Sequence, residues 1–302
     1  MLVQSCGISR IAFKLWRNTL ENKILKNIYK CPVCGLPLIK LEGQYVCEKE
    51  HSFDISQKNY VNLLLANQKK TKDPGDNKEM MENRRNFLNK GYYSKFSEGL
   101  NEAVAIYLNP SGEYILDAGC GEGYFITMLK NKLSNEVNRK NINYYGIDIS
   151  KSAIKYASGR DKAINFAVGS NFNLPILDNS LDCVIRNFSP GEAKEFSRVL
   201  KDDGKLIIIT PGVEHLFELK EKLYEKPRKH EVKNDFKEGF ELIDHRQIQY
   251  SIDLRDSEDI QNLITMTPYF WSITNEMKSR INKLKPFTST LHFNIHVYNK
   301  VL

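Results

Sequence analysis

A glycine-rich turn that follows a short apolar run constrains this chain more than any other stretch of its sequence. The run begins at Tyr114 and ends at Asp117, and Gly119, Gly121 and Gly123 then stand at alternate positions. Apolar residues recur after the turn with helical spacing. We therefore predict a strand, a tight turn and a helix, with bare glycine backbone that a ligand can approach closely.

The spacing of this turn and its acidic residue indicate the kind of ligand. A dinucleotide-binding turn has the pattern G-x-G-x-x-G and holds a pyrophosphate at the helix N-terminus. Here the pattern is D-x-G-x-G-x-G, and the Glu122 carboxylate would repel a pyrophosphate. It favours a ligand with an ammonium or sulfonium group, such as S-adenosylmethionine, and Asp117 either orders the turn or meets a cationic group. The alternative is a strand–helix turn that binds nothing.

Strand-like and helix-like stretches alternate after the turn, which predicts an α/β fold with a mostly parallel sheet. Nearly continuous apolar runs are typical of parallel strands that are covered on both faces. These runs occupy 144–148, 164–168, 181–185 and 205–210. Two late stretches, 240–254 and 289–298, are expected to close the sheet as an antiparallel edge.

Ligands of such folds bind beyond the carboxyl ends of the strands. Asp148 ends the second strand, and we expect its carboxylate to accept hydrogen bonds from two ribose hydroxyls. The alternative role is a helix N-cap, which Ser150 or Ser152 could supply instead. The residues that we expect at this cofactor edge are Asp117, Gly119, Gly121, Glu122, Gly123, Asp148, Ser170 and Asn171.

A second motif has the spacing of a zinc site. Cys31-Pro-Val-Cys34 is followed by Cys47 and His51. Four such ligands suit tetrahedral Zn²⁺ and leave no open coordination position, which predicts a structural metal. A segment of ~25 residues buries too little apolar surface to fold alone, so the metal would supply its folding energy. The alternative is a set of unrelated free cysteines.

The net charge of +7 is concentrated in the N-terminal third of the chain. Residues 1–30 hold six Lys and Arg against one acidic residue, and residues 58–95 hold nine against four. A local basic excess is typical of a surface that binds a polyanion, although a solvated surface is the alternative. No apolar run reaches transmembrane length, and the N-terminus lacks the apolar core of a signal peptide. We expect a cytoplasmic protein without a membrane partner.

Taken together, these motifs resemble the bacterial 23S rRNA (guanine-N1)-methyltransferases over roughly residues 29 to 300. The matching pieces are Cys31-Pro-Val-Cys34, Cys47 with His51, Tyr60-Val61-Asn62-Leu63-Leu64, Asp73-Pro74-Gly75-Asp76, Glu79-Met80-Met81, Arg84-Arg85, the turn at 116–124, Gly146-Ile147-Asp148-Ile149-Ser150, Thr210-Pro211-Gly212 with His215-Leu216, and Met266-Thr267-Pro268. The zinc spacing, the Asp-Pro-Gly-Asp turn and the glycine turn occur in the family's order, which makes the resemblance specific.

The resemblance implies a class I, Rossmann-like methyltransferase domain with a mostly parallel seven-stranded sheet and an antiparallel C-terminal edge. It also implies a small N-terminal zinc ribbon that recognises RNA. On this basis the chain divides into an extension of unknown role (1–28), the zinc-binding domain (29–72), a helical linker (73–112) and the methyltransferase domain (113–302). The family's metal ligands match Cys31, Cys34, Cys47 and His51, and its cofactor contacts match Tyr93, Glu122-Gly123 and His215. Because Tyr93 precedes the core, the linker helices must fold back over the cofactor.

The resemblance further implies methylation of guanine N1 in a 23S rRNA hairpin loop, by direct in-line transfer from S-adenosylmethionine. Asn187 is placed to hold the edge of the base, and Asp182 is a weaker catalytic candidate because it lies inside a strand. Residues placed to meet RNA phosphates are Lys69, Lys70, Lys72, Arg84 and Arg85.

Two other functions stay open at this point: methylation of a small molecule or of another RNA, and RNA binding without catalysis. The guanine within the hairpin and the formation of a homodimer are open as well.

Overall fold

The computed structural model describes residues 27–69, 71, 73–136, 139, 141–231, 238–272, 274, 277 and 286–301. Almost all of the expected extension 1–28 lies outside the described residues, as do Lys70 and Lys72.

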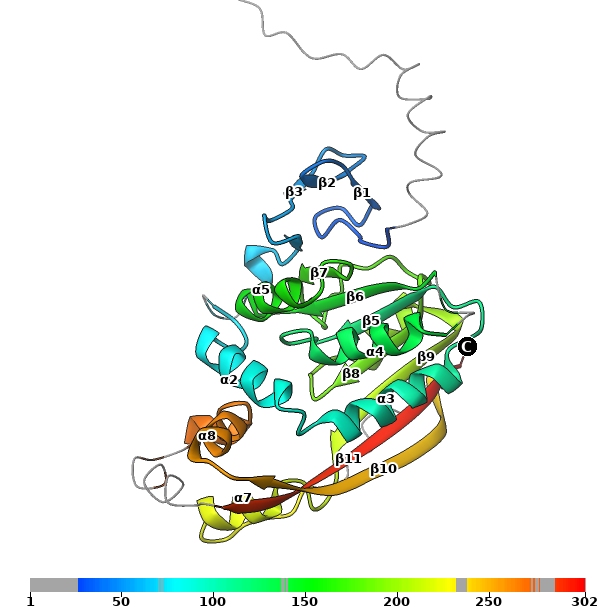
Figure 1. Ribbon diagram of the computed structural model, residues 1–302. Helices are drawn as coiled ribbons and strands as arrows, with labels where there is room; N and C mark the ends of the chain where they lie inside the picture. Colours follow the sequence, from blue (N-terminus) through cyan, green and yellow to red (C-terminus); the bar gives the residue numbers. More distant parts are fainter. Residues whose placement is uncertain are drawn as a thin grey trace, which may run out of the picture.

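A single eight-stranded sheet runs through the molecule (Figure 1), in the order β10-β11-β9-β8-β5-β6-β7-β4. The six strands from β9 to β4 pair in parallel, whereas β11 is antiparallel to both β9 and β10. The predicted antiparallel C-terminal edge is therefore confirmed. The strands are β4 (Tyr60–Asn62), β5 (Tyr114–Ala118), β6 (Asn143–Asp148), β7 (Asn165–Val168), β8 (Leu181–Asn187), β9 (Leu200–Pro211), β10 (Phe240–Leu254) and β11 (Phe287–Lys300).

Seven of these strands are those expected, and the eighth comes from the zinc-binding segment. β4 lies within the stretch 29–72, yet it pairs with β7, with Val61 opposite Ala167. The Leu63 N–H then donates to the Val168 carbonyl at 2.9 Å. The apolar side chains of β4 are buried on the edge of the large sheet, so this part of the N-terminal segment packs as part of the methyltransferase fold.

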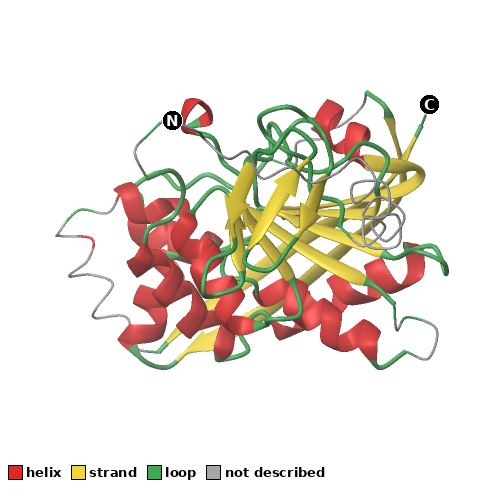
Figure 2. Ribbon diagram, turned by 90° about the horizontal axis from the view of Figure 1, so that it is seen from above, coloured by secondary structure: helices red, strands yellow, loops and turns green. Residues whose placement is uncertain are grey.

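Helices connect and flank the strands (Figure 2). Polar side chains cap several of them: Asn77 accepts a hydrogen bond from the Met80 N–H, and Ser150 accepts one from the Ala153 N–H. The helices are α2 (Lys78–Asn89), α3 (Ser94–Tyr107), α4 (Tyr124–Ser134), α5 (Lys151–Arg160), α6 (Ala193–Val199), α7 (Phe217–Leu223) and α8 (Ser257–Thr265), with 3-10 turns η1 (Ala66–Gln68) and η2 (Pro268–Ser272).

The two faces of the sheet are covered by different material. Buried residues of α3, α4, α5, α7 and α8 pack with strand residues such as Ile115 and Phe293 on one face. On the other face, Phe196 and Val199 of α6 share a core with residues of the zinc-binding segment. Each large apolar side chain that is fully buried contributes about 1.5–3 kcal/mol, so both layers stabilise the sheet.

The zinc-binding segment forms a three-stranded antiparallel sheet of β1 (Leu38–Lys40), β2 (Gln44–Cys47) and β3 (Ser52–Asp54). It lies at the β7 end of the molecule in Figure 1. The Tyr29 ring packs edge-to-face on Tyr45, at 5.4 Å, and on Tyr145 of β6, at 5.3 Å. The ribbon is thereby fixed against the large sheet, and it covers a face that a helix would otherwise cover.

Candidate active site

A cavity of about 570 Å³ opens at the carboxyl ends of the central strands. This volume is typical of a pocket for a small-molecule ligand. Its walls come from the glycine turn, from the segments after β6, β7, β8 and β9, and from α2 and η2. The linker therefore folds back over the pocket, as predicted. Predicted residues that line it are Arg84, Tyr93, Asp117, Gly119, Gly121, Glu122, Asp148, Ser170, Asn171, Asn187 and His215.

The three alternate glycines all adopt positive φ but meet different surroundings. A Cβ on Gly119 would lie 2.3 Å from Ser189 Cβ, and one on Gly123 would lie 3.0 Å from Ala157 Cβ. A Cβ on Gly121 would meet only Arg84 Cδ, at 4.0 Å. Gly119 and Gly123 thus permit close packing, and Gly121 is the open face of the turn.

Two carboxylates lie beneath this turn. Asp148 accepts hydrogen bonds from the Gly121 N–H at 2.9 Å and from the Ser150 N–H at 2.8 Å. Ser150, and not Asp148, is the N-cap of α5, so the N-cap alternative for Asp148 is wrong. Burial and then the neighbouring Asp148 raise the pKa of Asp117 to about 7, and Asp117 Oδ1 is buried without a hydrogen-bond partner among the described residues.

Glu122 is only 1% exposed, and its charge is paired within the protein. Arg160 donates from Nε, at 2.9 Å, and from Nη2, at 2.6 Å, to Glu122 Oε2. Burial raises the pKa of Glu122, and Arg160 opposes that shift. Among the described residues only Glu122 Oε1 has no hydrogen-bond partner, so this atom is the part of the carboxylate that stays available to the predicted cationic ligand.

Tyr93, between α2 and α3, and His215, between β9 and α7, both line the pocket. His215 Nδ1 accepts the His292 N–H at 3.2 Å, so in the neutral ring the proton is on Nε2. Burial lowers the pKa of His215 to about 3, which keeps the ring neutral. The Tyr93 ring packs edge-to-face on Phe293 of β11 at 5.2 Å. Sequence reasoning from residues alone would place His215 on a helix surface; only the family resemblance indicated its role.

The segment after β8 places in the pocket a side chain that the sequence did not single out. Phe188 has a positive φ of 51° and is 46% exposed, although it lines the pocket. Next to it, Asn187 Oδ1 is buried without a partner among the described residues. Ser189 Oγ donates to the Ala118 carbonyl, and Asn171 Nδ2 donates to the Pro190 carbonyl at 3.1 Å. The signal in the sequence that could have indicated Phe188 is the end of the strand in Asn-Phe-Ser-Pro.

Asp182 lies at the other end of β8 from the pocket, which removes it as a catalytic candidate. Its Oδ2 accepts the backbone N–H groups of Glu113 and Tyr114 at 2.9 and 3.0 Å. Lys201 Nζ pairs with the same carboxylate, 2.9 Å from Oδ1. Asp182 therefore fixes the start of β5 against β8.

The expected RNA-contacting residues are also distributed differently. Arg84 lines the pocket and pairs with Asp76 at 2.8 Å, so it is not placed on the outer surface. Arg85 Nη1 donates to the Tyr156 carbonyl at 3.4 Å, and its guanidinium lies over the Tyr156 ring. Lys69 is exposed.

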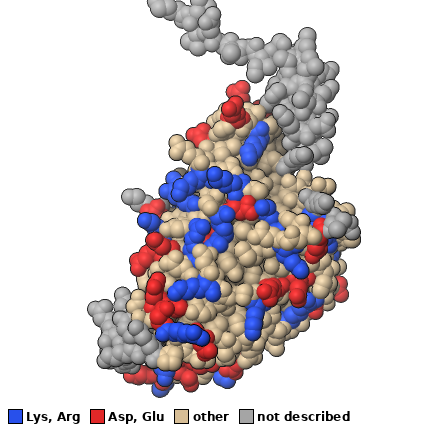
Figure 3. All heavy atoms as spheres, viewed as in Figure 1, with Lys and Arg blue, Asp and Glu red and all other residues tan. Residues whose placement is uncertain are grey.

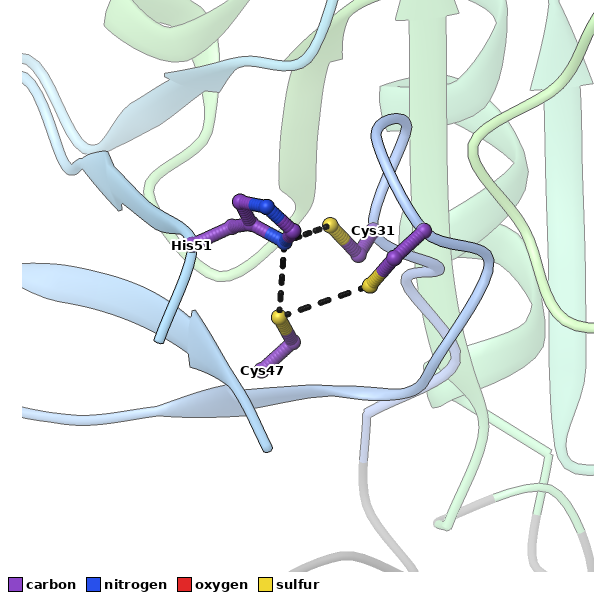
Figure 4. A group of neighbouring side chains, drawn as sticks. Cys31, Cys47 and His51 are labelled. Carbon is purple, nitrogen blue, oxygen red and sulfur yellow. Dashed lines mark hydrogen bonds between the residues drawn. The ribbon is translucent and has the colours of Figure 1, made fainter. Parts of the chain in front are cut away.

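The four predicted metal ligands converge at a separate site (Figure 4), and their ligand atoms lie within 4.8 Å of one another. His51 Nδ1 lies 3.7 Å from Cys31 Sγ and 3.4 Å from Cys47 Sγ, and Cys34 Sγ lies 3.6 Å from Cys47 Sγ. Ideal tetrahedral Zn²⁺ with Zn–S of ~2.3 Å and Zn–N of ~2.0 Å separates the sulfurs by ~3.8 Å and sulfur from nitrogen by ~3.5 Å. The donor set fits zinc, and all four positions are filled by protein.

Three features together define the class of protein. They are a small-molecule pocket at the carboxyl edge of a mostly parallel sheet, a glycine turn in its wall, and an acidic residue at the end of the next strand. The chain is an S-adenosylmethionine-dependent methyltransferase, and a family model described as a methyltransferase domain matches residues 109–267. A second model, described as the N-terminal part of RlmA, matches residues 29–72. A protein of Micromonospora griseorubida, named provisionally as a 23S rRNA (guanine-N1)-methyltransferase, is 32% identical over 64% of this chain and 69% of its own. The chain belongs to this methyltransferase family.

Two further relatives cover most of the chain. YxjB of Bacillus subtilis (strain 168), also named provisionally as a 23S rRNA (guanine-N1)-methyltransferase, is 29% identical over 89% of this chain and 96% of its own. The 23S rRNA (guanine(748)-N(1))-methyltransferase of Streptomyces fradiae is 25% identical over 84% of this chain and 90% of its own. Both alignments extend well beyond the methyltransferase domain.

Within the described part of the chain, the helices are too short or too polar to cross a membrane.

Proposed function

We propose that this protein transfers the methyl group of S-adenosylmethionine to N1 of a guanine in a hairpin loop of 23S rRNA. The observation that carries the proposal is that two neighbouring residues, Asn187 and Phe188, both line the cofactor pocket. An exposed ring suits the flat face of a base that has left its stack, and an unpartnered amide oxygen suits a donor on the edge of that base. The names of the relatives support the choice of guanine and of 23S rRNA.

The chemistry assigns distinct roles to the two residues. Guanine N1 reacts in the plane of the base, so no protein group can stay on the line between N1 and the incoming carbon. We infer that Asn187 Oδ1 accepts from the exocyclic 2-amino group, which leaves N1 open and distinguishes guanine from adenine. Phe188 then stacks on the base and fixes its plane, and such positioning supplies much of the rate.

The N1–H bond breaks as N1 gains the methyl group and S-adenosylhomocysteine leaves, so a base or a water must accept the proton. His215 is not that base in this scheme. Its Nδ1 is occupied by the His292 N–H, and Nε2 carries the ring proton. When S-adenosylmethionine is bound, it supplies the electrophilic methyl group. The neutral imidazole then acts as a donor in the wall of the pocket, in agreement with its lowered pKa.

A basic surface close to the zinc ribbon supports RNA as the substrate. Figure 3 shows Lys and Arg side chains gathered on the face over α5, below the ribbon. Lys151, Lys155 and Lys162 are exposed on and just after α5. Asn59 Nδ2 donates to the Lys162 carbonyl at 3.0 Å and so joins this surface to the segment before β4. We define Lys58, Lys151, Lys155 and Lys162 as the α5 lysine surface and propose that it contacts RNA phosphates.

The decisive experiment is primer extension on 23S rRNA from cells that lack this protein, with complementation by the wild-type chain and by Asn187→Ala. A methyl group on guanine N1 blocks base pairing and therefore stops reverse transcription. We expect one stop to vanish in the deletion strain, to return with the wild type and to stay weak with the variant. An unchanged pattern of stops along the whole of 23S rRNA would overturn the substrate.

A further inference from the structure

Five residues that line the cofactor pocket each have a buried polar atom without a hydrogen-bond partner among the described residues. Buried polar atoms are normally satisfied, and a group of exceptions around one cavity indicates contacts that a ligand completes. The atoms are Arg84 Nε, Asp117 Oδ1, Glu122 Oε1, Asn171 Oδ1 and Asn187 Oδ1.

The charges of these groups are complementary to an amino acid. Asp117 and Glu122 contribute carboxylate oxygens, which suit an ammonium or a sulfonium group. Arg84 is the one described side chain in the pocket lining with a permanent positive charge, because burial keeps His215 neutral. The methionyl end of S-adenosylmethionine carries an ammonium, a sulfonium and a carboxylate. Its carboxylate needs a cationic donor, and bidentate guanidinium is the best donor for that group.

The position of Arg84 is fixed in advance of binding. Its Nη2 donates to Asp76 Oδ2 at 2.8 Å and points toward the Met266 carbonyl at 3.4 Å. Asp76 is itself tied to the core, since its carbonyl accepts from Ser150 Oγ at 2.6 Å. Arg84 Cδ lies over Gly121, the open face of the glycine turn. Nε and Nη1 of Arg84 have no hydrogen-bond partner in the part of the chain that the structure describes.

We propose that Arg84 binds the carboxylate of the methionyl group of S-adenosylmethionine, and that Asp76 and the Met266 carbonyl hold the guanidinium for this contact. Arg84 is thereby a cofactor-binding residue and not an RNA-phosphate contact. The linker helix α2 supplies it, so the linker completes the cofactor site. The proposal concerns the cofactor alone and stands or falls independently of the RNA substrate.

Calorimetric titration tests it with a cycle of two proteins and two ligands. The proteins are the wild type and Arg84→Gln, and the ligands are S-adenosylhomocysteine and its decarboxylated analogue. For the wild type we expect loss of the carboxylate to weaken binding about tenfold to a hundredfold, as for a charge-assisted hydrogen bond. Arg84→Gln should bind S-adenosylhomocysteine that much more weakly and should no longer distinguish the two ligands.

Lys78→Gln is the matched control, because it removes one exposed positive charge from the same helix. It should bind both ligands as the wild type does, and Arg84→Lys should keep part of the discrimination. Equal weakening of both ligands by Arg84→Gln would show a structural role and overturn the proposal. Equal binding of the two ligands by the wild type would also overturn the proposal, and that measurement does not depend on whether any variant folds.

Discussion

At the scale of single residues, the pocket keeps several side chains in states that they would not adopt in water. Phe188 stays exposed in a left-handed backbone conformation that a bulky residue rarely adopts. Asp117 is buried, and one of its carboxylate oxygens has no hydrogen-bond partner among the residues that the structure describes. Such features are costly to folding and persist where the surrounding structure enforces them. They are therefore the residues at which substitution should separate substrate handling from cofactor binding.

Phe188→Ala should lower kcat/KM for the RNA substrate about fivefold to 150-fold and leave the affinity for S-adenosylmethionine unchanged. Stacking of a base on an aromatic ring contributes about 1–3 kcal/mol, which corresponds to this range. Methyl transfer to transcribed rRNA hairpins and calorimetry provide the two readouts. Phe188→Tyr should retain most of the activity. Ile106→Ala, which removes another exposed apolar side chain, should have no effect; an equal loss in that variant would contradict the stacking role.

The affinity for S-adenosylmethionine should rise with pH up to about pH 7. Burial favours the protonated form of Asp117 and raises its pKa to about 7, whereas a cationic ligand favours the ionised form. Binding should therefore strengthen by up to about tenfold per pH unit below that pKa and level off above it. The folding stability of the ligand-free protein should change with pH in the opposite direction. It should fall as pH rises from about 4 to about 7, because the folded state binds the Asp117 proton more tightly than the unfolded state does.

Calorimetry between pH 5.5 and 8.5 measures this dependence, with Asp117→Asn as the control. The variant should bind with little change across the range. His215 does not titrate there, because its pKa is about 3. An unchanged slope in Asp117→Asn would assign the titration to another group.

At the scale of elements, the zinc ribbon covers part of one face of the large sheet, as a helix does elsewhere in the sheet. Its Tyr29, Leu38 and Tyr45 are buried in the same core as Leu116 and Ile147 of the central strands. The Lys30 N–H donates to the Pro175 carbonyl at 2.9 Å, in the segment that follows Ser170 and Asn171 of the pocket. A metal held by the four ligands would therefore support one wall of the catalytic fold in addition to the ribbon.

Cys47→Ser should lose zinc and destabilise the whole methyltransferase fold. Loss of a structural metal belongs to the strongest destabilising changes, about 3 kcal/mol or more, and should lower the melting temperature by about 5 °C or more. Metal analysis by mass spectrometry and thermal unfolding provide the readouts. Cys183→Ala, a cysteine inside the sheet, should retain one equivalent of zinc. Retention of that equivalent by Cys47→Ser would refute the four-ligand site.

At the scale of the whole molecule, the ribbon and the α5 lysine surface lie together, away from α7 (Figures 1 and 3). A polyanion that contacts both would extend over the region between the ribbon and α5, and it would release counterions from its phosphates as it binds. The affinity of the intact protein for RNA should therefore depend on salt, whereas its affinity for the cofactor should depend on salt much less.

Lys155→Gln combined with Lys162→Gln should weaken binding to 23S rRNA hairpins and reduce the slope of log affinity against log salt by about 1.4–1.8, or about 0.7–0.9 per lost phosphate contact. Fluorescence anisotropy at several salt concentrations measures the slope. Lys222→Gln combined with Lys226→Gln removes two exposed charges near α7 and should leave the slope as it is. Equal changes in both double variants would indicate a nonspecific charge effect.

The sequence by itself determined the features that depend on local pattern. The strand, glycine turn and helix at 114–134, the spacing of the four metal ligands and the late antiparallel pair all follow from periodicity, turn chemistry and ligand spacing. Each rests on residues that are close in the chain or on one run of apolar side chains, and the resemblance to a family then supplied the substrate.

The tertiary structure alone decided how distant segments meet. Glu122 lines the pocket, but Arg160, thirty-eight residues further on, pairs with its Oε2 and leaves only Oε1 for a ligand. Asp182 was a catalytic candidate, but it lies at the end of β8 that is away from the pocket, where its carboxylate accepts the Glu113 N–H. Arg84 was predicted to contact RNA, but it lies in the pocket because α2 folds back over the glycine turn. A sequence pattern fixes the type of a side chain and its local direction, but its partners depend on which elements pack together.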